Sequence, residues 1–404
     1  MKSYLRRIGP GFMTAAVVIG PGSITVMSSA GATYGYKLLW MPVFTAVFMA
    51  TFTVLFMRLG VLDKETFFEK VRGGLGKPFA ILCGASAYYI IAAFQFGNNI
   101  GVSTAMNGLL PGVPTWIWPL FFNALSLVFL FALKKVYVHL ERLMVTLVVV
   151  MLFSFLANLC FASPNLKRTA VGLIPRIPRE ADWIALGGLV ATTFSILAAI
   201  SQSYLVRSKG WGKEEEREGR RDAIAGMSVL MCISMVILIT SAAVLEQKDV
   251  PLKSASDMAA QLEALFGSAS RIIFCSGLAA ASLSSFIMNA MIGGILLSDS
   301  LGKGWRFADP FPKCLGAIAL LVGMVLAILT TQVEGVSPVR VLVAAQAGTL
   351  LAVPLAVVAS LFVLLSAVPL PKGNLRHFLR FMVVLGGLLL CATSFLTAKK
   401  IFGF

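Results

Sequence analysis

Apolar stretches long enough to cross a bilayer recur along this chain, and they constrain its fold more than any other feature. A membrane-spanning helix needs about 20 mostly apolar residues. A chain with 58% hydrophobic residues, 13% charged residues and a mean hydropathy of +0.87 lies outside the range of water-soluble domains. We therefore predict an all-α integral membrane protein. Its eleven transmembrane helices are expected at residues 10–33, 38–60, 79–110, 115–133, 140–162, 182–206, 222–244, 270–298, 314–331, 339–367 and 378–398.

The basic residues are unevenly distributed between the predicted loops. If the N-terminus is cytoplasmic, the segments on that side hold 23 of the 34 Lys and Arg. Because basic residues concentrate in cytoplasmic loops, we predict a cytoplasmic N-terminus and an outward C-terminus in a plasma or bacterial inner membrane. The net charge of +16 then reflects topology and anionic lipid, so the bilayer is the expected partner and nucleic acid is not.

All eighteen Asp and Glu fall in predicted loops or at the ends of predicted helices. An isolated charge in hydrocarbon is expensive, so a membrane protein that binds a bare metal cation or relays a proton usually buries a carboxylate for the purpose. The sequence therefore predicts that the solute at the bilayer centre is handled by neutral groups.

The remaining reactive side chains give no sign of catalysis. The six Cys contain no Cys-x-x-Cys pair, so we expect neither a disulfide framework nor a zinc site. The two His, His139 and His377, lie where loops meet predicted helices. An intramembrane enzyme would then lack groups for acid–base or metal chemistry, and we expect no enzymatic activity and no cofactor.

The first predicted helix is interrupted at mid-membrane depth by Ile19-Gly20-Pro21-Gly22-Ser23. Proline removes a backbone donor, and the two glycines lower the cost of leaving helical geometry. Free backbone groups at that depth are tolerated only where they face a cavity or a ligand, and a broken helix near the midplane indicates a transporter binding site. We therefore predict a break at Gly20, Pro21 and Gly22, with a simple proline kink as the alternative.

Further short motifs follow this break in order along essentially the whole chain. Together with the Gly-Pro-Gly-Ser break they are Gly9-Pro10-Gly11-Phe12, Gly31-Ala32-Thr33-Tyr34-Gly35-Tyr36, Leu38-Leu39-Trp40, Ile100-Gly101, Met106-Asn107-Gly108-Leu109, Leu205-Val206-Arg207-Ser208-Lys209, Ser284-Ser285, Gly293, Gln346 and Pro354. In these motifs the chain resembles the Nramp family of divalent-metal transporters. The resemblance implies a LeuT-type fold in a single transmembrane domain, with residues 8–162 and 182–367 as inverted five-helix repeats and residues 378–398 as a peripheral helix.

At the positions that carry metal chemistry in this family, the chain differs. The family's Asp-Pro-Gly-Asn falls on the segment from Gly20 to Ser23, so both side-chain ligands are changed. The family's Met-Pro-His falls on the segment that begins at Ser195, where a hydroxyl replaces the soft thioether that favours transition metals. A second His falls on Gln202.

The polar positions that the family places on other helices are changed as well. An Asp and a Glu associated with proton passage fall on Gln95 and Asn98, and a Gln of helix 10 falls on Ala352. The Pro expected in helix 6 is missing, and Gly187-Gly188 and Thr192-Thr193 are weaker helix breakers. Whether helix 6 breaks is left open at this point.

These residues predict a neutral central site. Half-helix N-termini carry partial positive charge, and without a carboxylate beside them they favour a neutral polar or anionic solute. We expect a secondary transporter that moves such a solute by alternating access, rather than bare Mn²⁺ or Fe²⁺, and no site for transition metals. The predicted substrate-binding residues are Gly20, Gly22, Ser23, Gln95, Asn98, Thr192 and Ser195.

Two alternatives share this scaffold, and the coupling ion is a separate question. A hydrated divalent cation of the Mg²⁺ type could be the substrate, or the chain could be a non-transporting sensor with a solid core at helices 1 and 6. Hydroxyls and carbonyls suffice for a monovalent cation, so Val17, Gly20, Ser284 and Ser285 are predicted as a possible Na⁺ coupling site. We expect a monomer.

Overall fold

The computed structural model describes most of the chain. It covers residues 9–132, 163–246, 254–259, 267–331, 337–370 and 373–403, together with residues 146, 156, 157, 159 and 252. Every regular element within this part of the chain is helical. The α-helices are α2 (Pro10–Val18), α3 (Pro21–Tyr34), α4 (Trp40–Leu62), α5 (Phe67–Leu75), α6 (Lys77–Leu109), α7 (Ile117–Ala132), α9 (Leu166–Gly172), α10 (Trp183–Thr193), α11 (Ile196–Ser208), α12 (Glu216–Val244), α13 (Ala255–Ala259), α15 (Ser270–Ser300), α16 (Pro310–Thr331), α17 (Pro338–Thr349), α18 (Val353–Ser366) and α19 (Asn374–Phe402).

The predicted spans agree closely with these helices. Ten of the predicted segments coincide with a helix or an interrupted helix, whereas segment 140–162 lies almost wholly outside the described residues. Within the described part, eight helices are long and apolar enough to cross a membrane, or nine if the bent pair α2 and α3 is one span. Helix α7 is apolar but shorter. The all-α membrane fold is therefore confirmed, while the number of eleven stays a prediction.

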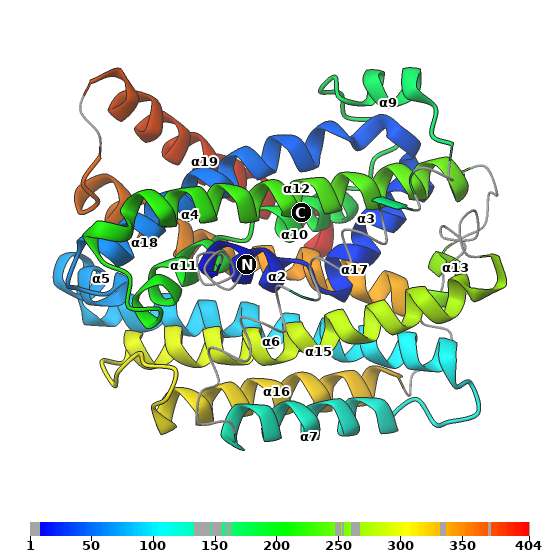
Figure 1. Cartoon of the computed structure of the whole chain (residues 1–404), viewed down its shortest axis with the longest axis horizontal. Coiled ribbons are helices and arrows are strands. Elements are labelled where there is room, and N and C mark those ends of the chain that lie inside the picture. Colours follow the sequence, from blue (N-terminus) through cyan, green and yellow to red (C-terminus); the bar gives the residue numbers. More distant parts are fainter. Residues whose placement is uncertain are drawn as a thin grey trace.

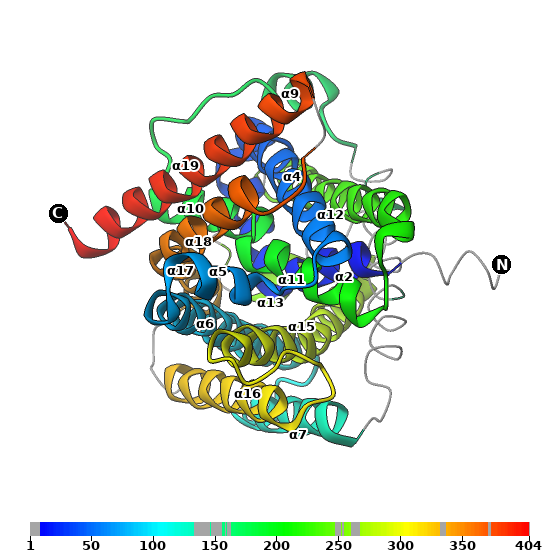
Figure 2. The ribbon, with the colours of Figure 1, turned by 90° about the vertical axis from the view of Figure 1, so that its left-hand side faces the viewer.

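The long helices run side by side in stacked layers. In Figure 1, α16 and α7 lie below α6 and α15, and Figure 2 shows the same order when the bundle is viewed along its helices. The interrupted helices α2 and α11 lie between these layers and α4 and α12 on the other side. The broken segments therefore lie in the middle of the bundle.

Burial separates inner from outer helices. In the most apolar windows of α10 with α11, and of α15, 83% of the residues are buried, against 28% for α16 and 39% for α19. The inner helices are rich in small and hydroxyl residues, which allow close helix approach without lipid contact. The outer helices present large apolar side chains such as Leu329 and Phe381, as expected for surfaces that face lipid.

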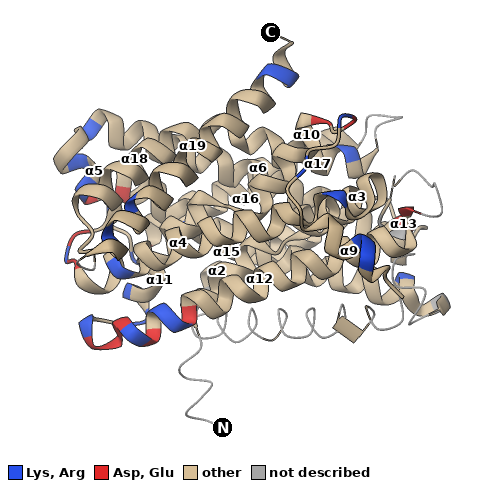
Figure 3. Cartoon of the chain, turned by 90° about the horizontal axis from the view of Figure 1, so that it is seen from above, with Lys and Arg blue, Asp and Glu red and all other residues tan. Residues whose placement is uncertain are grey.

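Charged residues gather at the two ends of the bundle, and the middle is almost free of them (Figure 3). Ion pairs close each end: Arg58 pairs with Glu216 at one end, and Lys37 pairs with Glu180 at the other. This separation is what a bilayer-spanning protein requires, because charges are excluded from the hydrocarbon region.

Candidate functional site

The first helix breaks where its Gly-Pro-Gly sequence predicts. Helix α2 ends at Val18, α3 begins at Pro21, and their axes differ by 59°. Ser23 closes the gap, because its hydroxyl accepts a hydrogen bond from the Gly20 N–H (3.0 Å) and donates one to the Gly20 carbonyl (2.9 Å). These bonds add to the backbone contacts of Gly20, whose N–H also donates to the Val18 carbonyl (3.0 Å) and whose carbonyl accepts from the Ile24 N–H (3.1 Å).

Helix 6 is also interrupted, which settles the question that the sequence left open. Helix α10 ends at Thr193 and α11 begins at Ile196, with Phe194 in a non-helical conformation (φ −116°, ψ 73°) between them. Ser195 caps the second half, since its hydroxyl accepts from the N–H of Ala198 at 3.4 Å. A hydroxyl cap can therefore start a new half-helix without proline.

A small cavity lies between the two breaks. The centre of a water-sized sphere can occupy about 20 Å³ of it, which is room for about one water molecule. None of its lining residues is charged, and about half of them carry a hydroxyl or an amide. The lining residues are Val17, Val18, Gly20, Gly22, Ser23, Phe94, Asn98, Ala191, Thr192, Ser195, Ser285, Asn289 and Gln346.

Most of the predicted site residues meet in this cavity. Two do not line it: Gln95 donates to the Phe286 carbonyl (2.8 Å), and Ser284 donates to the Ala281 carbonyl of its own helix (3.2 Å). Gln95 still supports the wall, because its side-chain oxygen accepts from Asn98 at 3.2 Å. Those that line it are Val17, Gly20, Gly22, Ser23, Asn98, Thr192, Ser195 and Ser285.

Two amide side chains in the wall were not predicted as site residues. Asn289 lies one turn after Ser285 on α15, and its Nδ2 donates to the Ser285 hydroxyl at 3.0 Å. Gln346 projects from α17 against Gly22, so closely that a Cβ at that glycine would collide with its amide. The four-residue spacing of Ser285 and Asn289 places both on one helix face and is the signal that could have identified Asn289.

Buried carboxylates exist, but they lie at helix ends away from the cavity. Asp222, near the start of α12, accepts from the N–H groups of Gly9 (2.9 Å) and Gly11 (2.6 Å) and so caps the N-terminus of α2. Asp299, at the end of α15, accepts from the hydroxyl of Tyr204 at 2.6 Å. Both positions agree with the prediction that acids lie at segment ends, although their burial was not foreseen.

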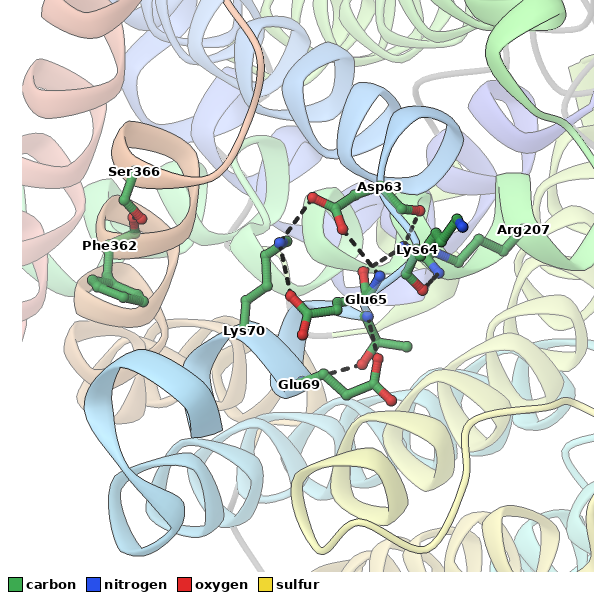
Figure 4. Close-up of polar contacts among 9 residues, drawn as sticks. Asp63, Lys64, Glu65, Glu69, Lys70, Arg207, Phe362 and Ser366 are labelled. Carbon is green, nitrogen blue, oxygen red and sulfur yellow. Dashed lines mark hydrogen bonds and ion pairs between the residues drawn. The ribbon is translucent and has the colours of Figure 1, made fainter.

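One end of the bundle is held together by a polar cluster around the turn that follows α4 (Figure 4). Arg207, from α11, donates to the carbonyls of Asp63 (2.9 Å), Lys64 (2.8 Å) and Glu65 (2.5 Å). Lys70 pairs with the Asp63 carboxylate at 2.8 Å. This turn carries basic residues that we predicted from the sequence to lie on the cytoplasmic side.

Charge interactions shift the pKa values of the Asp63–Lys70 pair. Partial burial acts to raise the pKa of Asp63, but the hydrogen bonds from Lys70 and the Glu65 N–H outweigh it, so that pKa is lowered. Burial acts against the charged form of Lys70 as well, and the bonds to Asp63 and Glu65 reverse the effect and raise its pKa. Both groups are therefore held in their charged forms.

Comparison with known proteins agrees with the resemblance seen in the sequence. The family model described as natural resistance-associated macrophage protein-like matches residues 11–399. The chain belongs to the Nramp family. It is 27% identical over 361 residues to the divalent metal cation transporter MntH of Klebsiella pneumoniae strain 342, covering 85% of this chain and 82% of that protein.

Solved structures confirm the fold. A manganese transporter of Eremococcus coleocola superposes with a TM-score of 0.82 at 18% identity, covering all of this chain and 88% of the other. Two transporters with the LeuT-type fold match at a TM-score of 0.55: Mhp1 (14% identity, 97% and 93% coverage) and MhsT (18% identity, 95% and 98% coverage). Because the chain belongs to the Nramp family of transporters, the expectation of a transporter rather than an enzyme is confirmed.

The residues that line the cavity include no carboxylate, thioether, thiol or imidazole. No group of three or more His, Cys, Asp or Glu side chains comes together among the residues that the structure describes. The position where the family carries an Asp is Gly20, and a Cβ there would lie 3.0 Å from the Ser285 hydroxyl oxygen and 3.6 Å from Asn98 Oδ1. Hydroxyl and amide oxygens carry no net charge, so they do little to offset the dehydration of a divalent ion.

Proposed function

We propose that this Nramp-family protein is a secondary transporter whose central site takes a small polar or anionic solute rather than bare Mn²⁺ or Fe²⁺. The observation that carries the proposal is the neutrality of the cavity between the two helix breaks, whose lining contains no charged side chain. The interrupted helices at its walls support alternating access, because such breaks mark the binding sites of transporters with this architecture.

Coulomb energy supports the exclusion of bare divalent metals. A carboxylate about 4 Å from a divalent cation contributes roughly 8 kcal/mol at an effective dielectric constant of 20. Gly20 and Ser23 provide no such charge, and neutral oxygens alone do not offset the dehydration of a small doubly charged ion. The proposal therefore predicts weak binding of bare Mn²⁺.

A hydrated divalent cation is the second candidate. The chain is similar to proteins named divalent metal cation transporters, and hydroxyls and amides such as Ser285 and Asn98 could bind the water shell of an ion. The present cavity has room for about one water molecule, so a hydrated ion would require its walls to separate. The presence of the cavity disfavours the sensor alternative, which expected a solid core.

Coupling and orientation complete the proposal. Na⁺ remains the proposed coupling ion, bound near Val17, Gly20, Ser284 and Ser285. Ser285 borders the cavity, but Ser284 donates a hydrogen bond within its own helix. The proposed Na⁺ site therefore has weaker support than the proposed solute site. Solute uptake that is unchanged when choline replaces Na⁺ would rule out Na⁺ as the coupling ion.

We also propose that the protein is a monomer with a cytoplasmic N-terminus. Cysteine labelling from either side of the membrane would test the position of the N-terminus.

Uptake into liposomes tests the exclusion of metals. Purified protein in sealed vesicles is given radiolabelled Mn²⁺ at micromolar concentration, beside vesicles without protein. The proposal predicts equal uptake in the two preparations. Saturable Mn²⁺ uptake that depends on the protein would refute it, whereas uptake of Mg²⁺ at millimolar concentration would support the second candidate.

A further inference from the structure

We propose that the solute is a small organic carboxylate that carries its own N–H or O–H donor and a short apolar group. This inference rests on the proposed function, because it names the class of solute for the same cavity. Three separate features of the cavity wall lead to it: a helix N-terminus, a buried acceptor without a donor, and an adjoining apolar space.

The helix N-terminus provides the site for the carboxylate. Helix α3 has 14 residues and begins at the cavity with Gly20 as its N-cap. The Ser23 hydroxyl is engaged with Gly20, and the N–H groups of Gly22 and Ser23 belong to the first turn, where no preceding helical carbonyl can accept from them. Such groups, together with the helix dipole, favour a negative charge.

The buried acceptor provides the site for a donor. Asn289 is 2% exposed and lines the cavity, and its Oδ1 has no hydrogen-bond partner among the described residues. Its Nδ2 is already used on Ser285. An unpaired buried carbonyl oxygen is costly, so a ligand that brings an N–H or O–H group to Asn289 gains what an inorganic anion or a plain carboxylate cannot.

The adjoining space provides the site for the apolar group. A second cavity shares Phe94, Ala191 and Ser195 with the first. Its other walls are apolar except for Thr349, and they include Ile196 and Leu350. A hydrated cation would gain nothing from this surface, whereas an aliphatic group would lose its contact with water there. This feature favours an organic solute over a hydrated ion.

Room for such a solute requires movement of the wall. The amide of Gln346 fills the space beside Gly22 and also approaches Gly97, where a Cβ would lie 3.5 Å from its Nε2. Gln346 is an unbranched side chain near the end of α17, and rotation about its χ angles would open the polar cavity next to the free N–H groups of α3. Movement of the Gln346 side chain would therefore enlarge the cavity.

Binding of matched acids to the full-length protein in detergent tests the inference. α-Hydroxyisovalerate has the carboxylate, the donor and the apolar group; isovalerate lacks the donor, and α-hydroxyisovaleramide lacks the carboxylate. We expect α-hydroxyisovalerate and L-valine to raise the melting temperature by mass action and α-hydroxyisovaleramide to leave it unchanged. Isovalerate should bind at least about 10-fold more weakly than α-hydroxyisovalerate. Equal shifts with isovalerate would contradict the role of Asn289.

Two variants locate the discrimination. In the unmodified protein, α-hydroxyisovalerate should bind more tightly than isovalerate. Asn289→Leu should reduce the ratio of these two affinities to about one, because it removes the acceptor oxygen while keeping the side-chain volume. Asn123→Leu is the matched control: Asn123 is also buried with an unpaired Oδ1, but it does not line the cavity and should leave the ratio unchanged. If Asn289→Leu still binds α-hydroxyisovalerate more tightly than isovalerate by the same factor, the inference is contradicted.

Metal salts separate this inference from the proposed function. If none of the acids shifts the melting temperature while millimolar Mg²⁺ does, the inference is wrong and the hydrated-cation candidate stands. If micromolar Mn²⁺ stabilises the unmodified protein, the proposed function itself is wrong.

Discussion

A Cβ atom on Gly20 would lie 3.0 Å from the hydroxyl oxygen of Ser285. The glycine on the broken first helix and the serine on α15 thus face each other across the position where related transporters carry a metal-binding carboxylate. A side chain at position 20 would press against the Ser285 hydroxyl, which would have to move by a few tenths of an ångström, and neither residue carries a charge. Under the proposed function, an acidic side chain at position 20 should confer metal affinity once the Ser285 hydroxyl moves aside.

The double substitution Gly20→Asp with Ser23→Asn should create Mn²⁺ affinity. The carboxylate adds roughly 8 kcal/mol of attraction to a divalent ion, and its own desolvation offsets much of this. We expect an affinity gain of about 100-fold, or about 2.7 kcal/mol, measured by titration calorimetry. Gly112→Asp is the control and should bind no Mn²⁺, because Gly112 lies in a loop where a Cβ would have no neighbouring atom within 4 Å.

Removal of the Asp222 carboxylate should destabilise the first half-helix. Asp222→Ala leaves the N–H groups of Gly9 and Gly11 without this acceptor, and loss of a buried charge-assisted cap costs about 1–3 kcal/mol. Asp182→Ala removes a single exposed cap bond to Ile184 and should cost less. Thermal unfolding in detergent measures the difference, and equal melting temperatures would argue against the anchoring role of Asp222.

Arg207 should hold the turn after α4 through its three carbonyl contacts. Lysine at this position presents a single ammonium group and cannot span the carbonyls of Asp63, Lys64 and Glu65. Arg207→Lys should therefore accelerate amide hydrogen exchange in residues 63–70. Exposed Arg217 gives the matched control Arg217→Lys, and identical exchange in the two variants would count against this role.

The ion pair of Asp63 and Lys70 should show a defined pH dependence. The lowered pKa of Asp63 means that its stabilising effect is present above its unfolded value and is lost as pH falls through the folded one. The raised pKa of Lys70 means that its effect is present below its unfolded value and is lost as pH rises through the folded one. Because the pair lies at the end of the bundle and both side chains keep some contact with solvent, with 21% of Asp63 and 13% of Lys70 exposed, the effect should be about 1 kcal/mol.

The variant Lys70→Met measures this contribution. The difference in melting temperature from the unmodified protein should stay constant between about pH 5 and pH 9, and it should shrink below about pH 4, where Asp63 takes up a proton. A difference that changes steadily across the neutral range would point to another titrating group.

The break in helix 1 was predictable from sequence, but the break in helix 6 was not. Gly20-Pro21-Gly22 removes a donor and relaxes the backbone, which are local effects. Phe194 and Ser195 are compatible with a continuous helix, so their departure from helical geometry depends on the surrounding tertiary structure. The hydroxyl cap of Ser195 is a weak signal that many serines share.

The residues that line the cavity were only partly predictable, because some positions follow from local sequence and others depend on tertiary packing. The residues next to the first break follow from that break, so Gly22 and Ser23 were identified, whereas Thr192 was expected through the family resemblance of helix 6. Asn289 and Gln346 reach the same space from α15 and α17, which are distant in sequence, and only packing brings them there. Gln95 was expected in the wall because of its chemistry, but it turns toward the Phe286 carbonyl instead.

The most direct test of the neutral centre is electron paramagnetic resonance of Mn²⁺ added to the purified, unmodified protein, since bound Mn²⁺ loses the signal of the free aqueous ion. The account predicts that the free-ion signal is unchanged at micromolar Mn²⁺, while the variant with Gly20→Asp and Ser23→Asn diminishes it. Stoichiometric loss of that signal with the unmodified protein, reversed by Ser285→Ala, would contradict the account.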